Sequence, residues 1–123
     1  MLHPLEPAEA YRRVELDAWI AGSDQRQLTR VCLAEAVASL GRALAWDEKG
    51  DDARRDMAMF RGMSATQALL LGVDRSQPLG PALFTVYGEA GKRLTAALRR
   101  FDRLVVASVR QDLSDIEEAF AAV

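Results

Sequence analysis

The chain has 123 residues, half of them hydrophobic and 28% charged, with a formal net charge of −2. This composition predicts one globular domain over residues 1–123 and excludes a disordered chain. The weakly acidic balance and the lack of a basic run argue against nucleic acid as a partner. No stretch has the pattern of a signal peptide or a membrane span, and a single cysteine cannot form an internal disulfide. We therefore expect a cytoplasmic protein that does not insert into a membrane.

The first predicted element is a short helix over residues Pro7–Ile20, which Gly22 ends. Asp24 and Gln27 then have the spacing of a capping box, and they open a long helix that reaches about Trp46. The chain is thus expected to begin with a short N-terminal segment, residues 1–22, that is joined to a helical domain.

Residues that typically start or end helices divide the rest of the chain. The Lys49-Gly50 pair closes the long helix, and Asp51 or Asp52 caps a second one that runs to Gly72. A loop follows, after which Pro81 stands in the first turn of a third helix. That helix ends near residue 101, and residue 102, an aspartate, caps a fourth that reaches almost to the C-terminus. Strand patterns are absent, so the sequence predicts an all-α fold: an antiparallel four-helix bundle with a short N-terminal helical segment.

Two of these helices carry more apolar surface than a small bundle can bury. In the third helix the main stripe contains Leu83, Val86, Tyr87, Ala90, Leu94, Ala97 and Phe101. Beside it lies a strip of small residues between two large ones, Phe84, Gly88, Gly91, Thr95 and Leu98. The second helix has one stripe with Met57, Phe60, Ser64, Ala68 and Leu71, and another with Met59, Met63, Thr66 and Leu70. Extra apolar surface of this kind indicates a partner.

We interpret the additional stripes as the two walls of an apolar channel for an amphipathic partner helix. The channel is expected to be lined by Met59, Met63, Thr66, Leu70, Phe84, Gly88, Gly91 and Thr95. Methionine suits an adaptable binding surface, and glycine lets a foreign backbone approach closely. Two alternatives stay open: Met59 and Met63 could instead meet the N-terminal segment, and Tyr87 fits the bundle core better than a contact surface.

Residues that could support catalysis or metal binding are scarce. The only histidine, His3, stands near the N-terminus, and Cys32 has no second cysteine to form a metal or redox pair. The Glu-x-x-His spacing of helical di-metal proteins and the glycine loop that cradles phosphate are both missing. We predict no catalytic residues, no cofactor and no metal.

Four short motifs resemble the FliS family of flagellar secretion chaperones, and they occur in the family's order. They are Ala10-Tyr11, the capped helix start from Ser23 to Leu28, the turn Gly50-Asp51, and a pattern in the third helix formed by Val86-Tyr87, Lys92-Arg93-Leu94, Ala97 and Asp102. The resemblance implies an antiparallel four-helix bundle that binds the disordered C-terminal segment of flagellin as that segment folds into helices. Such binding prevents premature filament assembly and delivers the subunit to the flagellar export gate.

The resemblance also concerns the N-terminal segment. It implies that this segment lies near the flagellin site, so Tyr11 joins the expected partner-binding residues and Ala8–Ile20 is expected to act as a movable lid. Two other interpretations remain: a structural or regulatory bundle that buries its extra stripe by self-association, and an adaptor for another export substrate or a regulator. The chain is expected to be a monomer or a weak homodimer.

Overall fold

The computed structural model describes residues 25–122 as four helices. They are α2 (Gln25–Glu48), α3 (Asp52–Leu71), α4 (Gly80–Arg99) and α5 (Arg103–Ala121), and this part of the chain contains no strand. The predicted all-α bundle is therefore confirmed. The short helix expected over Pro7–Ile20, its role as a lid, and the capping aspartate at position 24 lie outside the described residues.

The helices begin and end at the capping and turn residues identified in the sequence. The Asp51 carboxylate caps α3 by accepting a hydrogen bond from the backbone N–H of Arg54, at 3.1 Å. The Asp102 carboxylate caps α5 in the same way, accepting from the N–H groups of the second and third helical residues. Pro81 stands in the first turn of α4, and Gly72 ends α3. Gly50 has a φ of 72°, which a residue with a side chain rarely adopts, so the tight turn between α2 and α3 depends on it.

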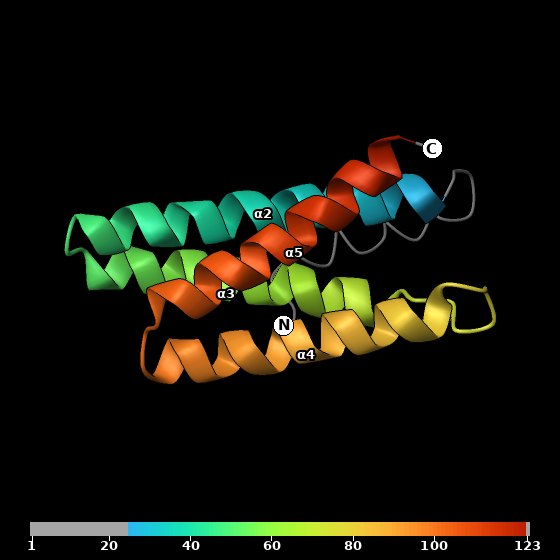
Figure 1. Ribbon diagram of the computed structural model, residues 1–123. Coiled ribbons are helices and arrows are strands. Elements are labelled where there is room, and N and C mark those ends of the chain that lie inside the picture. The colour runs from blue at the N-terminus through green and yellow to red at the C-terminus, as the bar shows by residue number, and fades with distance from the viewer. Residues whose placement is uncertain (1–24, 123) are drawn as a thin grey trace, which may run out of the picture.

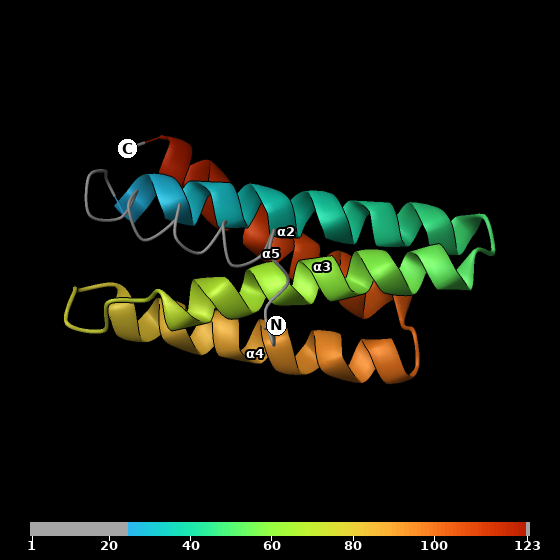
Figure 2. The ribbon, with the colours of Figure 1, turned by 180° about the vertical axis from the view of Figure 1, so that it is seen from behind.

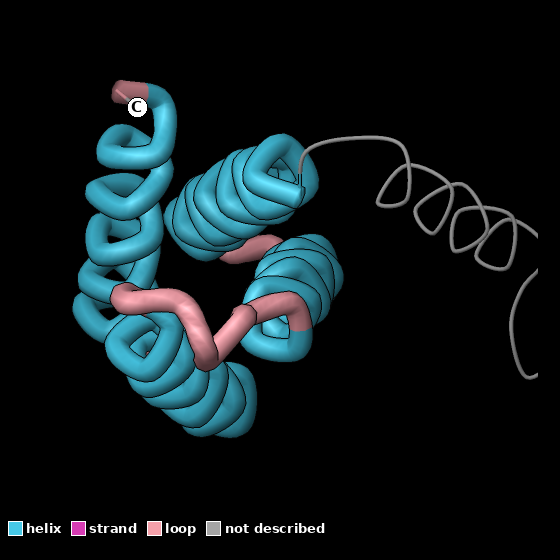
Figure 3. Tube along the Cα trace, turned by 90° about the vertical axis from the view of Figure 1, so that its right-hand side faces the viewer, coloured by secondary structure: helices cyan, strands magenta, loops and turns pink. Residues whose placement is uncertain are grey.

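The helices form a ring in which α2 packs on α3, α3 on α4, α4 on α5, and α5 back on α2 (Figure 1). The contact between α2 and α3 is the most extensive and that between α4 and α5 the least. Seen from behind, α2 and α3 run side by side with α4 beyond α3 (Figure 2). The view along the bundle shows that α5 is inclined to the other three helices and leans on α2 (Figure 3).

Two arginines hold α5 against α2. Arg103 donates hydrogen bonds to the carbonyl of Leu44 and to the carboxylate of Asp47, at 3.2 and 2.8 Å. About two turns further along α5, Arg110 Nε donates to the carbonyl of Val37 at 3.0 Å. Arg93 of α4 forms an ion pair with Asp112 of α5 at 3.6 Å, and α5 diverges from α4 toward its C-terminal end (Figure 1).

The core is built from alanines, leucines and valines of all four helices, with one tyrosine and one methionine. Its largest fully buried side chains are Tyr87, Leu33, Leu40, Met59, Leu94 and Leu113. On α3 the structure corrects the sequence interpretation, because Met59 and Thr66 belong to this core and are 0% and 1% exposed. The Thr66 hydroxyl is satisfied there by donating to the carbonyl of Gly62, at 2.8 Å.

The stripe on α3 that looked equally suited to the core instead faces outward. Met57, Phe60 and Leu71 are 64%, 57% and 76% exposed. The helix therefore does carry surplus apolar surface, but most of it lies on the other of its two stripes. No helix within residues 25–122 is both long enough and apolar enough to cross a bilayer.

Candidate partner-binding groove

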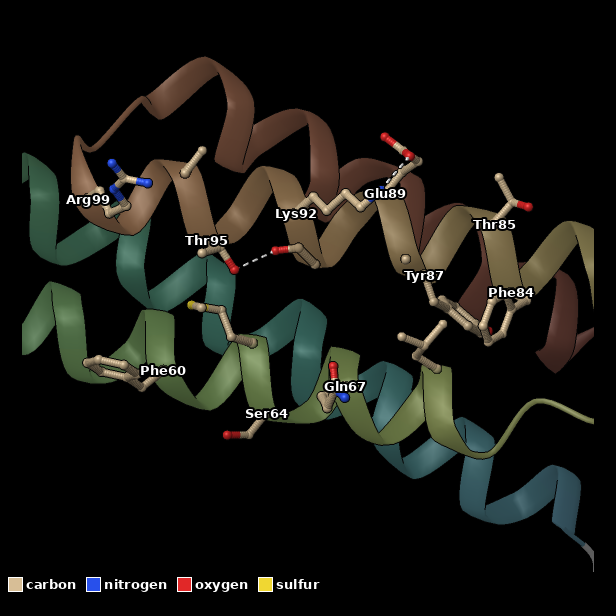
Figure 4. Close-up of a pocket in the computed structure, with 15 residues that line it drawn as sticks. Phe60, Ser64, Gln67, Phe84, Thr85, Tyr87, Glu89, Lys92, Thr95 and Arg99 are labelled. Atoms are coloured by element: carbon tan, nitrogen blue, oxygen red, sulfur yellow. Dashed lines mark hydrogen bonds and ion pairs between the residues drawn. The ribbon is translucent and has the colours of Figure 1, made fainter.

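A long open groove lies between α3 and α4 (Figure 4), and we refer to it as the α3–α4 groove. On α3 it is lined by Phe60, Met63, Ser64, Gln67 and Leu70. On α4 it is lined by Phe84, Thr85, Tyr87, Gly88, Glu89, Gly91, Lys92, Thr95, Ala96 and Arg99. The lining extends along α4 for about 22 Å, which is the length of roughly four helical turns.

The structure brings most of the predicted partner-binding residues together in this groove. Six of them line it: Met63, Leu70, Phe84, Gly88, Gly91 and Thr95. Met59 and Thr66 do not, because both are buried in the core on the inner side of α3. Tyr11 lies outside the described residues. The predicted channel is thus wrong for two positions of α3.

Residues that the sequence analysis placed elsewhere complete the groove. Phe60 and Ser64 were assigned to the other stripe of α3, and Gln67, Lys92 and Arg99 to no surface at all. A signal for them does exist in the sequence, since Phe60, Met63, Gln67 and Leu70 follow one another at intervals of three, four and three residues. This is the spacing of a seam between two packed helices.

Two glycines form the most open part of the groove. Among residues 25–122, a Cβ atom placed on Gly91 would meet nothing within 4 Å, and one on Gly88 would meet only Leu70 Cδ1, at 3.9 Å. Both residues are helical, and neither has a positive φ. Thr95 turns its hydroxyl back to donate to the carbonyl of Gly91, at 2.9 Å, which leaves its methyl group for the groove (Figure 4). The internal packing of α4 therefore requires neither glycine.

The charges of the groove are unevenly placed. Lys92 forms an exposed ion pair with Glu89 at 3.8 Å, one turn before it on the same helix. Arg99 lines the end of the groove and, within residues 25–122, forms no ion pair or hydrogen bond. At the opposite end the guanidinium of Arg75 stacks on the ring of Phe84, 4.4 Å from its centroid. The rim contributed by the C-terminal half of α4 is thus cationic.

Tyr87 separates the groove from a second cavity, of about 560 Å³, at the end of the bundle where α5 diverges from α4. The side chains of Leu69, Leu83 and Phe120 are among those that line this cavity. The Tyr87 hydroxyl is buried, and among the described residues it has no hydrogen-bond partner. Burial, together with the nearby Cys32, raises the pKa of Tyr87 to about 12.

The chemistry of the groove is that of an apolar binding surface with a few polar groups. The hydroxyls of Thr85 and Thr95 both donate to carbonyls of their own helix. Burial and the neighbouring Glu35 raise the pKa of the Cys32 thiol, which lowers its reactivity. Across the described ranges no cluster of three or more histidine, cysteine or acidic side chains is placed to hold a metal ion.

No protein-family model matches this chain, and no curated protein matches it either. The resemblance to the FliS family stays a prediction carried by the short motifs of the sequence. Support for a function therefore comes from those motifs and from the α3–α4 groove, taken together.

Proposed function

We propose that the protein is a cytoplasmic export chaperone that binds the C-terminal segment of flagellin in the α3–α4 groove. The segment folds into a helix as it binds, is kept from polymerising, and is delivered for flagellar type III secretion. Two things support the proposal: the resemblance of the sequence motifs to the FliS family, and a groove whose length and apolar lining suit an amphipathic helix.

The observation that carries the proposal is the pair of glycines on α4. Glycine in a helix interior is less stable than alanine by roughly 0.5–1 kcal/mol. At Gly91 a Cβ would meet no atom of residues 25–122 within 4 Å, so packing within this part of the chain does not offset the cost. A helix that packs closely over Gly88 and Gly91 does need their bare backbone. The two residues are therefore explained by a bound helix.

The geometry also accounts for how such a chaperone would act. A flagellin segment that is disordered when free would gain an apolar face when it folds into an amphipathic helix. Laying that face into the groove removes it from other flagellin subunits. Because the groove, as residues 25–122 form it, opens to the surface, a chain can enter it from the side and fold in place.

The test is calorimetric titration of the full-length chain with a peptide of the C-terminal segment of the host's flagellin. Gly91→Leu fills the groove with a side chain and is expected to weaken binding at least about tenfold, equivalent to about 1.4 kcal/mol. Its thermal stability should be unchanged or slightly higher, since leucine is the better helix former.

Ala107→Leu is the matched control, because it adds the same side chain to an exposed position of α5 outside the groove. It should bind the peptide as the natural chain does. Unimpaired binding by a folded Gly91→Leu variant would eliminate the groove as the site, and failure of the natural chain to bind the peptide would contradict the proposal as a whole.

Self-association is a second candidate, favoured by the exposed apolar side chains of Met57 and Leu71 on α3. A dimer that buried this stripe would be detected by sedimentation velocity at micromolar concentration. Met57→Lys should then return the protein to a monomer without affecting its helicity. A monomer at all concentrations would contradict this alternative.

A further inference from the structure

The two walls of the α3–α4 groove have the same repeat. On α4, Phe84, Gly88, Gly91 and Thr95 follow at intervals of four, three and four residues. On α3 the intervals among the lining residues from Phe60 to Leu70 are three, four and three. These intervals are those of a heptad seam, in which a neighbouring helix packs at an angle of about 20°. Both walls are therefore shaped for one helix that lies lengthwise between them.

The flanks of the two seams differ in charge. Lys92 and Arg99 directly follow seam positions on α4, stand one heptad apart and both line the groove. On α3 the corresponding flank consists of Met57, Ser64 and Leu71, again one heptad apart and uncharged, and the exposed Arg61 lies between Met57 and Ser64 on the same side of the helix. In a coiled coil such flanking positions pair with charges of the opposite sign on the neighbouring helix. The α4 rim of the groove thus carries two cationic side chains beside the acidic Glu89, while on the α3 side a charge comes from Arg61.

We propose that the groove takes a single amphipathic helix in coiled-coil register, and that this helix carries acidic side chains along the flank that faces α4. The proposal rests on the groove being the binding site named above, and it adds the register and the charge of the occupant. An uncharged or apolar flank of the same helix would lie over Met57 and Leu71, which are 64% and 76% exposed.

Charge complementarity selects acidic over basic occupants. Arg99 has no partner within residues 25–122, so an incoming carboxylate breaks no existing bond there. Lys92 holds Glu89 only at 3.8 Å and in full solvent, so it can exchange that carboxylate for one on the occupant. Each exposed pair of this kind changes affinity by about 1.4- to fivefold, so two together should amount to about two- to 25-fold.

The experiment compares two designed amphipathic peptides by fluorescence anisotropy with the full-length chain. Both peptides have the same heptad-spaced apolar face. The flanking positions carry glutamate in the first peptide and lysine in the second. The natural chain is expected to bind the glutamate peptide about two- to 25-fold more tightly. The Lys92→Glu/Arg99→Glu variant should reverse that preference.

Arg30→Glu/Arg100→Glu is the control, because it changes the net charge equally at two exposed positions that do not line the groove. It should keep the preference for glutamate. A third peptide, with the glutamate composition but with the apolar residues moved off the heptad spacing, should bind at least about tenfold more weakly than its parent.

Three outcomes would overturn the inference. The natural chain could bind the glutamate and lysine peptides equally, it could bind neither, or the Lys92→Glu/Arg99→Glu variant could keep the preference for glutamate. These outcomes are separable from a failure of the proposed function. A chain that binds flagellin without a charge preference keeps its function and loses this inference. A chain that prefers the glutamate peptide and ignores flagellin keeps the inference and loses the flagellin assignment.

Discussion

Leu40 on α2 lies directly over Gly62 on α3, and a Cβ atom placed on Gly62 would stand 2.7 Å from Leu40 Cδ2 and 3.1 Å from its Cγ. Leu40 is completely buried, so it has no free space into which it could turn. This contact lies within the most extensive helix pair of the bundle. The absence of a side chain at Gly62 is therefore what lets α2 and α3 approach so closely.

Replacing glycine by alanine should have opposite effects on the inside and the outside of the bundle. Gly62→Ala overpacks the core, at about 1–3 kcal/mol, which exceeds the gain in helix propensity of about 1 kcal/mol. Gly91→Ala meets no neighbour and should raise the free energy of unfolding by about 0.5–1 kcal/mol. Urea unfolding of both variants makes the comparison, and equal stabilities would mean that the α2–α3 contact relaxes freely.

Removing the hydroxyl of Tyr87 should stabilise the protein. The group is buried without a partner in the described part of the chain, so Tyr87→Phe removes a desolvation cost and should gain about 1 kcal/mol at neutral pH. A loss of stability would show that the hydroxyl has a partner after all.

The same substitution should change the dependence of stability on alkaline pH. The folded pKa of Tyr87 is raised to about 12 from 10.0, chiefly by burial, so folding favours the neutral phenol. This contribution is fully present below pH 10 and is lost as the pH rises from 10 to 12. The natural chain should therefore lose stability more steeply than Tyr87→Phe across that interval. Parallel curves from urea titrations at several pH values would contradict the assignment.

Asp47 joins three helices at one end of the bundle. Its carboxylate contacts Arg55 of α3 at 3.5 Å and Arg103 of α5 at 2.8 Å. Asp47→Ala should lower the free energy of unfolding by about 1–2 kcal/mol, since two partly buried guanidinium groups each lose a partner. Glu48→Ala is the control, because that exposed side chain contacts Arg103 alone and should contribute less than about 1 kcal/mol. A similar decrease in the free energy of unfolding of the two variants would show that the contacts of Asp47 to two helices add no stability beyond that of an exposed ion pair.

Binding of the flagellin peptide should show a clearly negative heat-capacity change. A disordered segment that folds onto the groove buries on the order of 1,000–3,000 Å², much of it apolar. Affinity should fall only modestly with salt, because the groove carries few charges and these are exposed. Calorimetry at two temperatures and two ionic strengths measures both quantities. A heat-capacity change near zero with a steep salt dependence would mean that the partner is recognised by charge.

Helix boundaries were predictable because each is set by a local interaction. Asp51 and Asp102 cap helices through hydrogen bonds that reach only two or three residues along the chain. Gly50 and Pro81 likewise act through their own backbone geometry. None of these effects depends on what packs against the helix, so the sequence alone is sufficient to locate them.

The sequence did not predict which apolar stripe of α3 turns toward the core. Periodicity identifies two apolar stripes on this helix but does not say which one turns inward. In the structure the inward face of α3 is the one that contains Gly62, whose bare backbone lies against Leu40 of α2, and Met59 and Thr66 are buried on that face. The wall contributed by α4 was predicted better, because Tyr87, Ala90 and the other buried residues form one clearly separate stripe there.

The ring of helices is unequally joined, and α4 has the smallest share of the interface. It also contains the two glycines whose backbone faces open space. Amide protons in the middle of α4 should consequently exchange with solvent through a partial opening that leaves the α2–α3 pair intact. The amide protons of α2 should exchange only when the whole domain unfolds. A helix bound in the groove would suppress this partial opening, so ligand binding should slow deuterium uptake along α4.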